Sequence, residues 1–212
     1  MKRLTIFIVL ALCVHSAVAQ FHYGIKGGAD LVTMALDWPG ITNEQVRLSY
    51  HVGLYGIHYA SERVSFSPEL LYTSKGFQAE APSVTAGGSP DAFTMHLHYL
   101  SLPLLAGYSL TERFLVRLGP EIGYLIAARS RFGLESNDAS ALWDERMDIG
   151  IVADVSYFIS ERINMGVRYV YGLRDVAPNN FGWTDPQDPL RDTFDFRSQN
   201  RVLQLSAGYR LR

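Results

Sequence analysis

Cysteine and charge are both scarce in this sequence. Cys13 is the only cysteine among 212 residues, and it lies near the start of the chain. The remainder can therefore form no disulfide and no cysteine-based metal or nucleophilic site. Charged residues make up 19% and the formal net charge is −2, which gives no electrostatic basis for nucleic acid as a partner. Beyond the first twenty residues no apolar run approaches 18 residues, so the sequence predicts no transmembrane helix.

The first part of the chain, residues 1–19, is predicted to be a cleaved signal peptide. Lys2-Arg3 is followed by the apolar segment Leu4–Val14 and by small residues, Ala-Val-Ala, at positions 17–19. These are the three parts of a secretory signal. A membrane anchor is the alternative, but the apolar segment is shorter than the ~20 residues that span a bilayer. We expect export, and a mature domain of residues 20–212.

Three short polar turns recur at nearly equal spacing. Residues 61–63, 111–113 and 160–162 share the pattern Ser/Thr-Glu-Arg, and alternating apolar and polar residues flank each of them. This pattern predicts three tight β-hairpins. Longer polar stretches lie between the hairpins, at about 33–48, 78–94, 130–144 and 174–198.

Short turns that alternate with long loops predict eight strands. An even strand number with turns at one end and loops at the other is typical of outer-membrane barrels. The predicted strands are Phe21–Val32, Ser49–Ala60, Val64–Phe77, Met95–Leu110, Phe114–Arg129, Glu145–Ile159, Ile163–Leu173 and Gln199–Leu211.

Apolar and polar side chains alternate along most of these strands. In the last strand, Leu203 and Leu205 share one face, and Gln204 and Ser206 share the other. Many polar positions are charged or glycine, which suits the narrow lumen of eight strands better than a solvated surface. The apolar faces end in aromatic residues at both levels, which fits a bilayer with two interfaces. We therefore predict an all-β fold, an eight-stranded antiparallel up-and-down transmembrane β-barrel.

The reverse orientation, with the apolar face inward, would make a soluble ligand carrier and is the alternative fold. The second and fourth strands alternate less clearly. His51, His58, His96 and His98 are therefore assigned to neither face.

Four segments resemble the PorT-like outer-membrane β-barrel family of Bacteroidota. They are Val64–Gly76, Tyr99–Leu105, Gly119–Leu125 and Arg168–Leu173, and the similarity runs through almost the whole mature chain. The resemblance implies an eight-stranded barrel in the outer membrane, usually with no assigned chemistry, and the barrel-assembly machinery as a partner during insertion. The family's namesake is linked to protein secretion and gliding, so an accessory role in secretion is an alternative function.

The charged residues of the polar face are the first candidate site. An eight-stranded interior is just wide enough for side chains, so we predict a salt-bridged network that fills the lumen. An ion path, and with it a small-solute pore or transport-related barrel, is the alternative. The residues are Lys26, Asp30, Glu69, Arg117, Glu121, Asp148, Asp154, Arg168 and Arg210.

Two other arrangements are alternatives that we do not favour. His96 and His98 point the same way on a strand and would need a third ligand to hold a metal. Ser49 and Ser101 with His51 and His96 would suit a lipid-modifying enzyme, but no Gly-x-Ser-x-Gly motif is present. We therefore expect no catalytic residue, no metal and no cofactor.

The last long stretch, 174–198, is acidic and aromatic and is predicted to face the cell exterior. Trp183, Asp185 and Asp188 are the candidate binding residues, because binding residues gather on loops that a rigid scaffold positions. An ordinary solvated loop is the alternative. We expect a structural or interaction role in the outer membrane through these loops, with outer-membrane lipid, lipopolysaccharide and an unidentified protein as partners.

Overall fold

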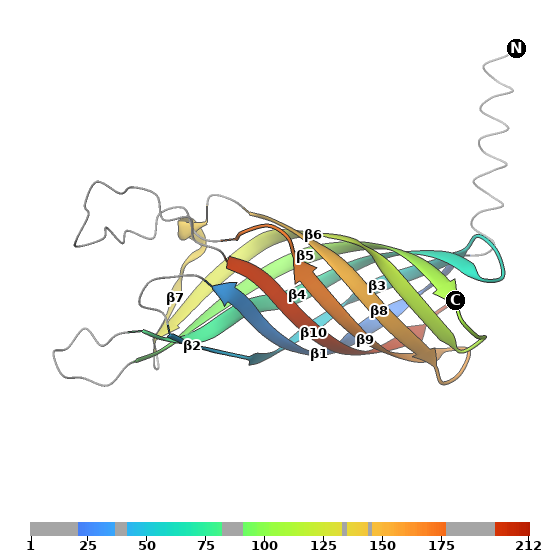
Figure 1. Ribbon diagram of the computed structural model, residues 1–212, viewed down its shortest axis with the longest axis horizontal. Helices are drawn as coiled ribbons and strands as arrows, with labels where there is room; N and C mark the ends of the chain where they lie inside the picture. The colour runs from blue at the N-terminus through green and yellow to red at the C-terminus, as the bar shows by residue number, and fades with distance from the viewer. Residues whose placement is uncertain (1–20, 37–41, 82–90, 133–134, 144–145, 177–197) are drawn as a thin grey trace, which may run out of the picture.

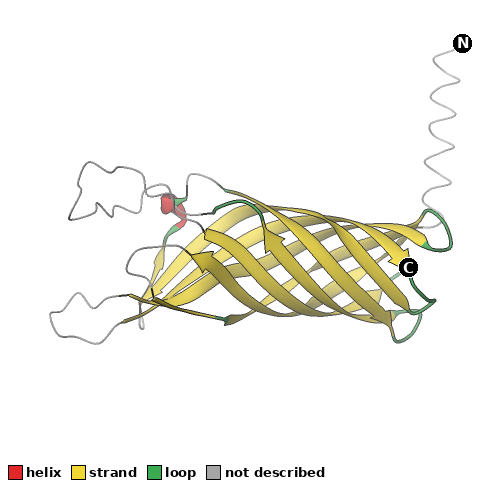
Figure 2. Cartoon of the chain, in the orientation of Figure 1, coloured by secondary structure: helices red, strands yellow, loops and turns green. Residues whose placement is uncertain are grey.

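The computed structural model describes residues 21–36, 42–81, 91–132, 135–143, 146–176 and 198–212. Two short strands, β2 (Thr42–Gln45) and β7 (Glu135–Asp138), and the 3-10 helix η1 (Ser140–Leu142) lie at one end of the molecule (Figure 1). The long strands, shown in yellow in Figure 2, are β1 (Phe21–Leu36), β3 (Arg47–Tyr59), β4 (Val64–Ala81), β5 (Asp91–Ser109), β6 (Phe114–Phe132), β8 (Met147–Phe158), β9 (Ile163–Gly172) and β10 (Ser198–Arg210).

The long strands form a closed antiparallel barrel. Each pairs with the next along the chain, and β1 closes the ring by pairing with both β3 and β10. The β1–β10 register runs from Gly24 opposite Arg210 to Leu36 opposite Ser198. The predicted all-β, eight-stranded, up-and-down topology is confirmed. No helix among the described residues is long and apolar enough to cross a membrane.

The three Ser/Thr-Glu-Arg turns lie at the end of the barrel that also holds the C-terminus (Figure 1). In each turn the hydroxyl group accepts a hydrogen bond from the backbone. Ser61 Oγ accepts from the Val64 N–H at 3.1 Å, and Ser160 Oγ accepts from the Ile163 N–H at 3.1 Å. Thr111 Oγ1 acts in the same way. This bond explains why a hydroxyl residue recurs at the first position.

At the opposite end, the loop end, the strands run further than the sequence predicts. β4 continues to Ala81 and β5 begins at Asp91, within a stretch predicted to be a loop. β2 and β7 also form inside predicted loops, where they pair with β4 and β6. These predicted bounds were wrong because hydrogen bonds between backbones continue where the alternation of polarity stops.

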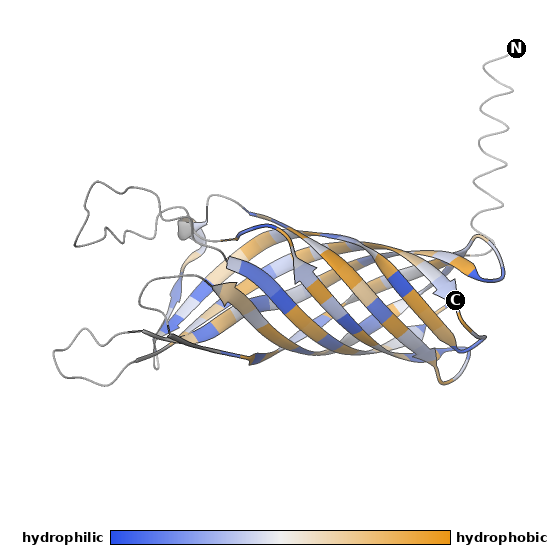
Figure 3. Ribbon diagram, in the orientation of Figure 1, coloured by the Kyte–Doolittle hydropathy of each residue, from blue (hydrophilic) through white to orange (hydrophobic). Residues whose placement is uncertain are grey.

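Apolar side chains point outward along the barrel. On the strands in view, apolar and polar residues alternate (Figure 3), and the polar ones on the inner face are buried. The predicted orientation, with the apolar face outward, is confirmed. Each Å² of apolar surface left in water would cost about 25 cal/mol, so this surface suits a lipid environment. The exposed apolar residues include Ile25, Leu54, Leu70, Leu102, Ile122, Ile151, Val167 and Leu205.

Tyrosines border this apolar band at two levels. Tyr108 and Tyr209 lie beside the turns and are exposed. Tyr124 and Tyr171, together with the half-exposed Tyr72, lie toward the loop end and form what we call the outer belt. Tyrosine gathers at the two interfaces of a bilayer, so the belts mark the limits of the apolar band.

Apolar side chains fill three levels of the interior. Tyr55, Ile57 and Leu115 pack together near the turns. A larger group, which includes Phe77 and Trp143, fills the loop end and is called the loop-end cluster. Between them lies an aliphatic layer that consists of Val32, Leu105, Val152, Val170 and Val202.

Charged side chains lie on both sides of the aliphatic layer. On β8, Asp154, Val152 and Asp148 follow one another toward the loop end, and all three are buried. The strands therefore position two groups of buried charges at different depths in the lumen.

Candidate functional site

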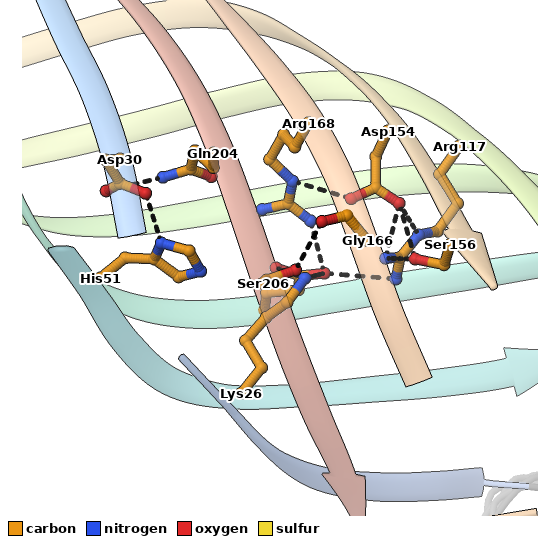
Figure 4. A network of polar contacts seen from close by, with 11 residues as sticks. Lys26, Asp30, His51, Arg117, Asp154, Ser156, Gly166, Arg168, Gln204 and Ser206 are labelled. Carbon is orange, nitrogen blue, oxygen red and sulfur yellow. Dashed lines mark hydrogen bonds and ion pairs between the residues drawn. The ribbon is translucent and has the colours of Figure 1, made fainter. Parts of the chain in front are cut away.

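The first group of charges, the turn-side cluster, is centred on Glu69. Its Oε1 atom lies 3.2 Å from Lys26 Nζ, 3.3 Å from Arg117 Nη1 and 2.8 Å from Arg168 Nη2. Asp154 lies 2.7 Å from Arg117 Nη2 and 3.1 Å from Arg168 Nε (Figure 4). The five residues come from β1, β4, β6, β8 and β9, so the cluster connects most of the barrel wall.

The second group, the loop-side cluster, is centred on Lys75. Its Nζ atom lies 2.8 Å from Glu121 Oε1 and 2.9 Å from Asp148 Oδ2. Asn200 Nδ2 also donates to Asp148 Oδ2, at 3.0 Å. The sequence places Lys75 on the polar face of the third predicted strand, but Lys75 was not named in the predicted network.

The two clusters balance their charges between them. The turn-side cluster has three cations and two carboxylates, and the loop-side cluster has one cation and two carboxylates. The charged residues of both clusters are at most 5% exposed. An uncompensated charge at such a depth costs several kcal/mol, so the balance explains how the lumen holds so many charges.

A third polar group lies beside the turn-side cluster (Figure 4). His51 Nδ1 lies 2.6 Å from Asp30 Oδ1, and Gln204 Nε2 donates to Asp30 Oδ2 at 3.2 Å. All three side chains are buried. The sequence assigned His51 to neither face, because the next inward positions on β3 are Gly53 and Tyr55 and the alternation is weak there.

Eight of the nine predicted lumen residues are buried in these groups, and Arg210 is not. Arg210 is partly exposed near the turns, and its guanidinium lies over the Phe158 ring at 5.6 Å from the centroid. Among the described residues no carboxylate lies within ion-pair distance of it. Arg210 occupies the last inward position of β10, where the lumen opens to water, so it needs no buried partner.

Of the residues weighed for catalysis, Ser49, His51 and Ser101 face the lumen, but among the described residues neither serine hydrogen bonds to a histidine. Ser101 lies inside the barrel and hydrogen bonds to Thr73 at 3.1 Å, whereas His96 lies on the outer surface. Ser49 is also inside, where its hydroxyl donates to the carbonyl of Ser74.

His96 and His98 do point the same way, with ring centroids 6.4 Å apart, and His51 faces the lumen instead. In the part of the chain that the structure describes, no three His, Cys, Asp or Glu residues form a group that could hold a metal ion.

Two predictions lie outside the described residues. These are the cleavage after Ala19 and the outer-loop binding residues Trp183, Asp185 and Asp188. They stay predictions.

Comparisons with known proteins agree with the barrel. The family described as outer membrane protein beta-barrel domain matches residues 16–177. Among curated proteins none matches the chain. Two solved structures are similar to the chain at 9–14% sequence identity, and at this identity the similarity shows only a shared fold.

The first similar solved structure is Ail, the attachment invasion locus protein of Yersinia pestis, in complex with the heparin analogue sucrose octasulfate. It has 14% identity and a TM-score of 0.50, and the match covers 91% of this chain and 99% of that chain. The second is Neisserial surface protein A, with 9% identity, a TM-score of 0.50, and coverage of 88% of this chain and 96% of that chain.

Proposed function

Given that this chain belongs to the outer membrane protein β-barrel domain family, we propose a structural or interaction role at the cell surface, carried by the loop end of the barrel. The observation that carries this proposal is the filled lumen. Two paired charge clusters and three apolar levels occupy it from the turns to the loop end. With its interior occupied by its own side chains, the barrel offers partners its outer surface and its loop end.

At the loop end, a buried tryptophan joins two segments that are far apart in the sequence. Trp143, which follows η1, is 4% exposed and donates from Nε1 to the Val176 carbonyl at 2.7 Å. This bond joins the segment after β7 to the segment after β9, over the interior. Loops that a rigid scaffold holds in place are the usual carriers of binding function.

The proposal also includes a narrower family, a route of export and a set of partners. The four motifs support kinship with the PorT-like family, and the first nineteen residues support export by a cleaved signal. Outer-membrane lipid, lipopolysaccharide, the barrel-assembly machinery and a protein partner at the loops are the partners that we propose. We propose no catalytic role and no resident cofactor.

The orientation can be tested with single cysteines, because the mature chain has none of its own. Ser136→Cys places a thiol on β7 at an exposed position of the loop end, and Glu112→Cys places one in an exposed turn. We expect a membrane-impermeant maleimide to label Ser136→Cys on intact cells and to label Glu112→Cys only after lysis. The opposite labelling pattern would show that the turns, and not the loop end, face the cell exterior.

The filled lumen has a separate test in planar bilayers. The folded protein is expected to give no stepwise conductance under conditions in which a porin conducts. Regular conductance steps would favour the small-solute pore instead.

A further inference from the structure

A basic patch lies on the outer surface of the barrel, just beyond the outer belt. It consists of His96 on β5 and Arg129 and Arg131 on β6, together with the guanidinium of Arg47 on β3, and we call it the rim patch. The Cα of Arg47 is at an inward-facing position of β3, opposite the buried Val32, and its partly exposed side chain reaches the β4 backbone. The Cα atoms of His96 and Arg129 are cross-strand partners. Side chains on the same face of paired strands are close neighbours, so His96, Arg129 and Arg131 present one surface. Arg47 is close enough to interact electrostatically with His96.

A β-bulge turns the two arginines of β6 outward. Tyr99 pairs with Leu125 and His98 pairs with Ala127, so Ile126 is an extra residue in β6. The extra residue reverses which positions face outward. Tyr124 is exposed before the bulge and Arg129 is exposed after it, whereas Ala128 is completely buried. Without the bulge, Arg129 would point into the loop-end cluster. Bulges commonly re-aim side chains in this way.

The guanidinium of Arg47 is held in place by the backbone of β4. Its Nη2 atom donates to the Lys75 carbonyl at 2.7 Å and to the Ser74 carbonyl at 3.4 Å. These bonds fix the position of the charge but do not neutralise it. Among the described residues, neither Arg47 nor Arg129 has a carboxylate within ion-pair distance.

The acidic residue that faces the patch from β7 is Asp138, whose Cα is the cross-strand partner of Arg129. Its Oδ1 atom accepts a hydrogen bond from the Ser140 N–H at 2.9 Å. Hydrogen bonding from Ser140 is also the main reason that the pKa of the Asp138 carboxyl lies below its ordinary value. The carboxylate is thus directed to η1. It also interacts electrostatically with Arg129, but among the described residues no carboxylate lies within ion-pair distance of Arg129.

Aromatic rings connect the rim patch to the apolar band. The His98 ring stacks on His96 with centroids 6.4 Å apart and on Tyr72 with centroids 5.7 Å apart. Leu100 and Leu102 follow on the same outward face of β5, toward the turns, and both are exposed. The surface therefore changes within a few residues from cationic to aromatic to aliphatic.

We propose that the rim patch binds the phosphate group of an outer-leaflet lipid whose acyl chains lie against the apolar band. A phosphorylated lipid has the same order of polarity, with an anionic head above apolar chains. Guanidinium groups pair with phosphate oxygens through strong, charge-assisted hydrogen bonds, often two at once. The inference rests on the proposed function, because it needs the loop end to face the outer leaflet.

The test uses the folded mature barrel in detergent micelles. It is titrated with bisphosphorylated lipid A and with the same lipid after removal of both phosphates, and the bound fraction is read by native mass spectrometry. We expect the phosphorylated lipid to bind more tightly. Arg47→Gln and Arg129→Gln should each weaken its binding by about tenfold, or about 1.4 kcal/mol, since each variant loses charge-assisted hydrogen bonds to the phosphate.

Arg113→Gln is the matched control, because it removes the same charge from an exposed turn at the other end of the barrel. It should leave lipid binding unchanged. Each variant must keep the heat-modifiable gel mobility of the folded protein. Should a glutamine variant misfold, Arg129→Lys is tested in its place. It keeps the positive charge but loses the paired N–H donors of the guanidinium, so it should bind the phosphorylated lipid with intermediate affinity.

Three results would overturn the inference: equal binding of the two lipids, an equal loss in Arg113→Gln, or displacement of the lipid by millimolar inorganic phosphate. The last result would assign the patch to a free anion. The cysteine-labelling experiment reads the orientation independently, so a failure of lipid binding is distinguishable from a failure of the proposed function.

Discussion

Replacing Glu69 with glutamine removes the negative charge that three cations share and keeps the size of the side chain. The Glu69 side chain is 0% exposed, and its Oε1 atom lies within 3.3 Å of Lys26, Arg117 and Arg168. The variant leaves Asp154 alone to balance these cations in the turn-side cluster. Removing one partner of a buried ion pair costs about 3–5 kcal/mol. That is a large part of the roughly 5–15 kcal/mol by which folded proteins are stable.

Equilibrium unfolding by urea in lipid vesicles, followed by the loss of heat-modifiable gel mobility, measures this cost. Glu112→Gln in an exposed turn is the control, and its effect should stay within about 0.5 kcal/mol. Adding Lys26→Met to Glu69→Gln removes one of the excess cations. We expect the double variant to recover part of the lost stability, which gives a coupling between the two positions.

A loss below about 1 kcal/mol for Glu69→Gln, equal to that of the control, would refute the reasoning. Such a result would mean that water reaches Glu69 and screens its partners. The filled lumen would then no longer support the proposed function.

Two other predictions use the same unfolding assay. Ser160→Ala removes the hydroxyl that accepts from the backbone of the third turn, so it should cost about 1 kcal/mol, and an unchanged midpoint would contradict a structural role for the repeated turn residue. Gly76→Ala should cost about 1–3 kcal/mol, because Gly76 has a φ of +115° and a Cβ there would lie 2.1 Å from the Met95 carbonyl oxygen. Gly27→Ala, whose Cβ would meet nothing closer than 3.3 Å, is its control, and equal costs at the two sites would argue against strain at Gly76.

The sequence predicts those strands best whose polarity alternates without interruption. β8 and β9 alternate between exposed and buried residues along nearly their whole length, and their inward charges, such as Asp154 and Arg168, were assigned correctly. β3 was harder because Tyr55 and Ile57 face the lumen, which makes both faces of the strand apolar near the turns. His51 could therefore not be placed from the pattern.

The pairing within the lumen could not be predicted at all. Glu69 and Arg168 are 99 residues apart in the sequence, but Arg168 Nη2 lies 2.8 Å from Glu69 Oε1 across the interior. Alternation gives the face on which a side chain lies, but not its depth or its partner, because these depend on the tilt of the strands and on their register. The same limit explains why Arg210 was grouped with the buried charges although it lies where the lumen opens.

The polarity of the wall reverses near the outer belt, and β5 and β6 achieve this in different ways. On β5 the outward positions stay the same, but the residue types change: Leu100 faces outward before the reversal, whereas after it His96 faces outward and Leu97 is buried. On β6 a bulge shifts the positions instead, so that Ala128 is buried and Arg129 is exposed. Both strands then have apolar side chains inside and polar ones outside, as in a soluble barrel. Since the medium decides which face must be polar, the reversal marks the boundary of the apolar band at the loop end, and the rim patch lies on that boundary.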